Sequence, residues 1–223
     1  DDCEGDDSNI AFEDRQLVDG VALRLYDWDA KVPLVGNTAA SISRWRNQLA
    51  YTLFNEELKL NERGQRLPWE LKGLPIALLG VSDDRSKVLF CDSYAVVRQG
   101  GKPLHRSPLV LNSGNEFIWQ ARVQQFTEQF AETAFQSLDQ AAISEYFRYL
   151  PPVGLLPANA VDWTTQESLF FPTNYVLRAR ALPLEELDKV IESSASLMPL
   201  MLDRPEQVEV IVPVPSAFYE PNI

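Results

Sequence analysis

A segment rich in proline and aromatic residues, 146–172, constrains the fold of this chain more than any other stretch. It holds four of the fifteen prolines and six aromatic residues, and only Arg148, Asp162 and Glu167 in it are charged. So many prolines are incompatible with a long helix or a central strand, while the apolar content is too high for a solvated linker. We therefore predict an irregular segment that packs against the core, or a binding surface, or both.

The aromatic side chains of this segment are the candidate interaction surface. Aromatic residues dominate the binding energy of protein interfaces, and a loop stiffened by proline loses little conformational entropy on binding. The alternative is that the segment closes over the core and buries Leu150, Val153, Leu155 and Leu156. The candidate contact residues are Phe147, Tyr149, Trp163, Phe170 and Phe171, and Trp163 is the one expected to reach a partner.

Hydrophobic periodicity elsewhere indicates two long helices and several strands. Apolar residues three and four apart predict helices at about 40–60 and 115–136, followed by two short ones. Alternation predicts β structure at 10–28, a hairpin at 76–98, and strands at 174–180 and 208–214. The last contains Pro213, so it is either an edge strand or a strand that ends at this proline. Because helices and strands are segregated along the chain, we predict an α+β fold: a mostly antiparallel sheet of about five to seven strands with two long helices on one face.

The domain organisation follows from the same pattern. Residues 1–9 are acidic and are expected to be disordered, and residues 10–223 are expected to form one compact domain. The segment 146–172 would be a seam between a front part, 10–145, and a smaller back part, 173–215. The chain begins with Asp and ends without a recognisable element, so we expect a piece excised from a longer protein.

Two stretches, about 10–60 and 86–136, share an internal pattern. An apolar-x-Phe-x-Asp motif occurs at 10–14 and 88–92, and Pro-Leu-Val followed by Asn-Thr or Asn-Ser occurs at 33–38 and 108–113. In each stretch the two motifs occur in the same order and precede a predicted long helix. The pattern is either a duplication, which would produce pseudo-two-fold symmetry, or a chance recurrence of strand and helix-cap chemistry.

Composition narrows the classes of partner. The net charge is −12, and no basic stripe of the kind that binds a phosphate backbone is present. No apolar run approaches the ~20 residues of a membrane span, and the first residues are acidic where a secretory signal peptide would be basic. We therefore predict no nucleic-acid or membrane partner, a cytoplasmic location, and a protein partner or other domains of the parent chain; the oligomeric state stays open.

Few residues carry catalytic potential. The chain has one histidine and no glycine-rich phosphate motif, so we predict no metal site and no cofactor. Cys3 and Cys91 are either a disulfide of an exported protein or a frayed terminal thiol and a buried strand thiol. A weak alternative site is formed by Asp27, Trp28 and Asp29, whose two carboxylates would share a face if the chain is extended there.

Four stretches together resemble the front part of long, uncharacterised bacterial proteins. They are FCDSYAVVR at 90–98, WQARVQQF at 119–126, FRYLPPVGLLP at 147–157, and VPVP at 212–215 with Tyr219-x-Pro221. The resemblance implies a bacterial, multidomain parent, loosely associated with phage-tail-like or injection particles. It implies no activity and no catalytic residues.

The sequence thus favours a non-enzymatic structural or protein-interaction module of a larger bacterial protein. Two alternatives remain: a carboxylate-dependent hydrolase of glycans or peptides acting through Asp27 and Asp29, and a glycan-binding module that uses Trp28 or Trp163. A cleft with two facing carboxylates would favour the hydrolase, an exposed apolar patch the interaction module, and an exposed tryptophan in a polar groove the glycan-binding module.

Overall fold

The computed structural model describes residues 21–97, 115–134, 143–156, 160–162, 164–165, 167–168, 170–204 and 206–220. Its helices are α1 (Ala39–Glu62), α2 (Asn115–Ala134), α3 (Ile143–Tyr146) and α4 (Leu187–Ala195), with 3-10 turns η2 (Leu184–Glu186) and η3 (Ser216–Phe218). Its strands are β1 (Leu78–Val81), β2 (Val88–Asp92), β3 (Tyr149–Leu150), β4 (Val161–Asp162), β5 (Glu167–Ser168), β6 (Val176–Pro183), β7 (Leu200–Met201) and β8 (Gln207–Val214). Helices and mostly antiparallel strands confirm the predicted α+β class.

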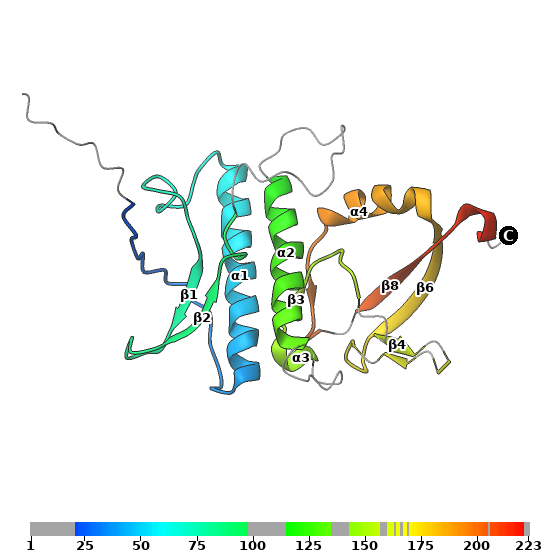
Figure 1. The fold of residues 1–223 in the computed structure, drawn as a ribbon, viewed down its shortest axis with the longest axis horizontal. Coiled ribbons are helices and arrows are strands. Elements are labelled where there is room, and N and C mark those ends of the chain that lie inside the picture. The colour runs from blue at the N-terminus through cyan, green and yellow to red at the C-terminus, as the bar shows by residue number, and fades with distance from the viewer. Residues whose placement is uncertain are drawn as a thin grey trace, which may run out of the picture.

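The strands form separate pairs instead of one sheet. Within the described residues there are four two-stranded sheets: β1–β2, β3–β7 and β4–β5 are antiparallel, and β6–β8 is parallel. The prediction of a single sheet of five to seven strands is therefore wrong. Figure 1 shows the reason: α1 and α2 stand between the β1–β2 hairpin on one side and the remaining strands on the other.

The two long helices pack side by side and run antiparallel. Two contacts show this orientation: Ser43 contacts Gln129 near one end of the pair, and Asn55 contacts Arg122 towards the other. The predicted helices at about 40–60 and 115–136 are confirmed. Helix α1 begins after Thr38, whose Oγ1 accepts a hydrogen bond from the backbone N–H of Ser41 at 3.1 Å. It ends just before Gly64, whose φ of 65° lies in the left-handed region that favours glycine.

One amide side chain ties α1 to the strand-rich half of the molecule. Asn47 is fully buried on α1, and its Nδ2 donates to the carbonyl of Tyr149 at 3.0 Å. Its Oδ1 accepts from the backbone N–H groups of Arg148 and Tyr149 at 2.9 and 2.8 Å. Asn47 therefore pairs with β3 much as a neighbouring strand would, and fixes the start of the 146–172 segment against the helix.

The largest apolar core, here called the aromatic core, lies between α2 and β6–β8. Its buried members are Phe126, Ile143, Phe147, Leu150, Ala160, Val161, Phe170, Phe171, Tyr175 and Leu202. The rings contact one another in a chain that runs from Phe126 through Phe147, Phe130 and Phe170 to Phe171. The proline-rich segment thus supplies much of a core.

Two local predictions are wrong. Residues 21–28 have no strand partner among the described residues, and Val21, Leu23 and Leu25 are exposed. Apolar alternation favours a strand only where a neighbouring edge completes the hydrogen bonds. Leu150 is buried as predicted and Leu156 packs partly against the aromatic core, but Leu155 is 93% exposed, because the chain leaves the β3 ladder at Pro151.

The internal pattern cannot be compared in full, since 10–14 and 108–113 lie outside the described residues, as do 1–9 and Cys3. The second copy of the first motif forms β2, and the first copy of the other motif leads into α1. The duplication therefore stays a prediction.

Candidate functional site

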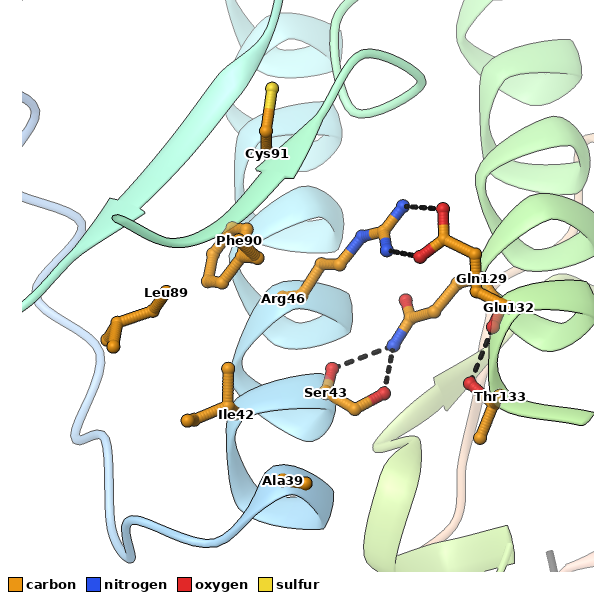
Figure 2. Close-up of a pocket in the computed structure, with 10 residues that line it drawn as sticks. All are labelled: Ala39, Ile42, Ser43, Arg46, Leu89, Phe90, Cys91, Gln129, Glu132 and Thr133. Carbon is orange, nitrogen blue, oxygen red and sulfur yellow. Dashed lines mark hydrogen bonds and ion pairs between the residues drawn. The ribbon is translucent and has the colours of Figure 1, made fainter. Parts of the chain in front are cut away.

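A cleft of about 330 Å³ opens between α1, α2 and β2 (Figure 2). One face of the first two turns of α1 contributes Ala39, Ile42, Ser43 and Arg46, at the spacing of a single helical stripe. The remaining lining residues are Leu89, Phe90 and Cys91 from β2 and Gln129, Glu132 and Thr133 from α2. One wall is therefore largely apolar and the opposite wall is polar.

Arg46 is the central charge beside this cleft. It is 7% exposed, and its Nε donates to Oδ2 of the fully buried Asp92 at 2.7 Å. The same guanidinium pairs with the half-exposed carboxylate of Glu132 (Figure 2). Burial alone would lower the pKa of Arg46, but the hydrogen bonds to Glu132 and Asp92 outweigh this effect and raise the pKa above its ordinary value.

Asp92 organises the end of β2 as well as the ion pair. Its Oδ1 accepts from the backbone N–H groups of Tyr94 and Ala95, each at 2.9 Å, and its Oδ2 also accepts from Nε2 of Gln125 at 3.0 Å. A buried carboxylate with this many donors is well compensated for the loss of water. Asp92 therefore joins the hairpin to both long helices.

A second buried cation lies further along the helix pair. Arg122 is 2% exposed, and its Nη2 donates to Oδ1 of Asn55 at 3.1 Å, while its Nε has no hydrogen-bond partner within the described residues. The hydroxyl of fully buried Tyr51 likewise finds no partner in the part of the chain that the structure describes. Burial lowers the pKa of Arg122 and raises the pKa of Tyr51. In this part of the interface, buried polar atoms are thus left without some of the hydrogen bonds that they could form.

The cleft offers groups for binding more than for bond-making. Arg46 is neutralised by two carboxylates, so it presents little positive charge to a ligand. Among the lining residues, no nucleophile is hydrogen-bonded to a base, and Figure 2 shows the Cys91 sulfur pointing away from Arg46. Cys91 is a free, exposed thiol, which corrects the expectation that it is buried.

The residues of the weak alternative site do not line the cleft and do not face one another. Asp27 forms an exposed ion pair with Arg85 at 3.2 Å, and Asp29 accepts from the backbone N–H of Lys31 at 3.3 Å. Trp28 packs edge-to-face on Trp69, and its Nε1 donates to Glu56 at 3.0 Å. Each group is thus engaged in a separate local contact instead of a shared acid–base site.

The candidate interaction residues lie mainly in the interior. Phe147, Phe170 and Phe171 are 0%, 3% and 6% exposed within the aromatic core, so the expectation that they form an exposed surface is wrong. Tyr149 is half-buried and stacks on Tyr51 at 5.4 Å. Trp163 lies outside the described residues. Packing these rings together removes far more apolar surface from water than leaving them exposed would.

The β6–β8 pair carries an apolar row that is partly exposed. In the register of this pair, Leu177, Ala179 and Ala181 stand beside Val208, Val210 and Val212 on one face. One half of this row packs against the aromatic core, through Leu177, Val208 and Val210. The other half is exposed and consists of Ala179, Ala181 and Val212. The valine alternation at 208–214 identified the strand, but only the pairing shows that the apolar row extends beyond the core.

Comparison with known proteins assigns no function to these sites: no family model, no curated protein and no solved structure matches the chain. Within the described ranges, no helix is long and apolar enough to cross a membrane. The same residues contain no cluster of three or more side chains suited to holding a metal ion.

Proposed function

We propose that this chain is a protein-interaction module whose binding surface is the β6–β8 sheet. The observation that carries the proposal is the exposure of a parallel strand pair. Parallel sheets occur almost only where both faces are covered, and an isolated pair of strands is marginally stable in water. Here Val176 is 57% exposed and Val212 is 36% exposed, although both lie within eight-residue strands.

The aromatic core supports this surface from one side. Leu177, Val208 and Val210 are packed against it, so the first half of the sheet is anchored. The second half carries the same apolar row past the edge of the core, with Ala179, Ala181 and Val212 in contact with water. A partner that covers this row would bury apolar area without any rearrangement of the core.

The test compares two exposed valines on two strand pairs. The full chain is immobilised and used to capture proteins from a lysate of the source cells, alongside the variants Val212→Asp and Val88→Asp. Val88 is 63% exposed on β2 and serves as the matched control. We expect Val212→Asp to lose the captured partner and Val88→Asp to keep it, with both variants melting within a few degrees of wild type. Equal capture by all three chains would remove the proposal.

A further inference from the structure

We propose that the free edge of β6 binds an extended peptide segment in which apolar and acidic residues alternate. This inference rests on the proposed function, because it names the mode and the chemistry of the same interaction. It is carried by three features of the strand pair: the direction of its unpaired backbone groups, the position of its prolines, and the charges on its second face.

The backbone groups available at each edge follow from the ladder. The N–H of Val176 donates to the carbonyl of Glu206 at 3.1 Å, and the register pairs Val176 with Gln207. In a parallel ladder, alternate residues of each strand bond to the partner and the residues between them point outward. The outward positions are therefore Leu177, Ala179, Ala181 and Pro183 on β6, and Gln207, Glu209, Ile211 and Pro213 on β8.

The prolines make the two edges unequal. Pro213 occupies an outward position within β8, so it costs the β6–β8 ladder no hydrogen bond but removes one donor from the β8 edge. This agrees with the predicted alternative of an edge strand. On β6 the outward positions Leu177, Ala179 and Ala181 all keep their N–H groups, and Pro183 is the last residue of the strand. No described residue pairs with this edge, which is therefore the better acceptor for an added strand.

One face of the added strand would continue the apolar row. Ala179 and Ala181 are small and exposed, and they leave room beside them for larger side chains. Apolar residues at alternate positions of the partner would lie next to these alanines as cross-strand neighbours. They would extend the row formed by Leu177, Val208 and Val210.

The other face of the added strand would meet positive charge. Arg178 and Arg180 project from β6 on this face, and β8 supplies Glu209, which pairs with Arg180 at 3.6 Å. Arg178 has no ion-pair partner in the described part of the chain and is exposed. Two arginines beside one glutamate form a basic spot on a chain of net charge −12. Acidic residues in the partner strand would complement it.

The binding experiment uses the full chain and three labelled seven-residue peptides, with fluorescence anisotropy as the readout. The first peptide alternates valine and glutamate, the second alternates valine and lysine, and the third has the composition of the first with its valines and glutamates in separate blocks. We expect the first to bind at least about tenfold more tightly than either control, and more weakly at high salt. Equal binding of all three peptides, or no binding of the first, would overturn the inference.

Two proline variants test the edge. Ala179→Pro removes an outward N–H from β6, and the matched control Ile211→Pro removes one from β8; neither residue donates to the β6–β8 ladder. We expect Ala179→Pro to weaken binding of the first peptide by about tenfold or more and Ile211→Pro to change it less than about twofold. A loss with Ile211→Pro alone would place the strand on β8 and contradict the inference.

A charge reversal provides a test that does not depend on proline. Arg178→Glu is expected to reverse the preference, so that the valine–lysine peptide becomes the tighter ligand. Sedimentation of the wild-type chain distinguishes a second copy as the occupant: a dimer that Ala179→Pro dissociates would contradict an acidic partner strand. If Val212→Asp abolishes partner capture while Ala179→Pro does not, the interaction surface stands and only the β6 edge is excluded.

Discussion

The α1–α2 interface and the aromatic core are both buried, but they differ in their content of polar side chains. Every buried polar or charged residue described lies on α1, α2 or β2: Arg46, Asn47, Gln48, Glu57, Asp92, Arg122, Gln125, Gln129 and Thr133. The aromatic core contains only apolar residues and Tyr175, whose hydroxyl donates to the carbonyl of Met201 at 2.6 Å. The α1–α2 interface thus adds directional bonds to an apolar cluster that includes Tyr51, Phe54 and Ile118, whereas the aromatic core is held mainly by apolar packing.

This difference separates stability from specificity. Burying apolar area stabilises a fold in proportion to the area and is largely indifferent to direction. Buried hydrogen bonds add little net stability, yet leaving one partner unpaired is costly, so they favour one arrangement over others. We infer that the aromatic core supplies most of the stability, while the polar interface fixes how the hairpin and the two helices meet.

The largest loss of stability is expected when a large side chain of the aromatic core is replaced by a small one. Phe147→Ala removes a fully buried ring that contacts Phe126 and Phe130, and should lower the free energy of unfolding by about 3 to 5 kcal/mol. Urea unfolding followed by circular dichroism measures the loss. Leu155→Ala, at a 93% exposed position of the same proline-rich segment, should change it by less than about 0.5 kcal/mol. Similar losses in both variants would contradict the comparison.

A somewhat smaller and strongly non-additive effect is expected at the buried ion pair. Arg46→Met leaves the buried Asp92 without a counter-charge, and Asp92→Asn leaves Arg46 with Glu132 as its one remaining carboxylate partner among the described residues. Each variant should lower the free energy of unfolding by about 2 to 4 kcal/mol. The double variant should cost less than the sum of the two by at least about 1 kcal/mol, because the first change already removes the interaction. A double-mutant cycle by urea unfolding measures this coupling energy. Strict additivity would show that the pair does not specify the interface.

The smallest effect, and the one that depends on pH, is expected at Glu57. Burial first, and then the charge of Glu70, raises the pKa of this carboxyl to about 7 from an ordinary 4.5. The folded state therefore holds a proton that the unfolded state releases between these values. The stability that Glu57 contributes is fully present below pH 4.5 and is lost as the pH rises through about 7.

Glu57→Gln mimics the protonated carboxyl and does not titrate. We expect this variant to match wild type at pH 4.5 and to exceed its free energy of unfolding at pH 8 by about 1 to 2 kcal/mol, a value reduced for solvent screening. Thermal unfolding at both pH values provides the measurement. Glu56→Gln, one residue away on α1, is the control, and a pH-independent difference between Glu57→Gln and wild type would contradict the predicted titration.

Local sequence signals placed most elements correctly. The spacing of apolar residues located α1 and α2, and alternation located the β1–β2 hairpin, β6 and β8. These signals depend on residues within a few positions of each other, and periodicity records them directly. Where the neighbour was distant the prediction was wrong: Val21, Leu23 and Leu25 alternate as a strand would but have no partner edge among the described residues.

The site required long-range information. Phe170 and Phe171 look like surface anchors in a proline-rich loop, but they are buried because Phe130 of α2 and Tyr175 pack against them. The polar side chains of α1 and α2 look like solvated faces, yet Arg46 and Gln125 meet at Asp92 from separate helices. Arg46 and Gln125 are 46 and 33 residues away from Asp92 in the sequence, and helical or strand periodicity cannot predict contacts at such separations.

Composition and periodicity were therefore sufficient for the α+β class, the two helices and the acidic character of the chain. The tertiary structure alone decided which of the apolar segments became core and which stayed exposed. The physical reason is that burial depends on the number of neighbours that converge on a residue, whereas alternation records only which face it shares. The valines of β8 alternate throughout the strand, but Val208 and Val210 pack against the aromatic core whereas Val212 is exposed. The exposed end of this row is part of the proposed binding surface.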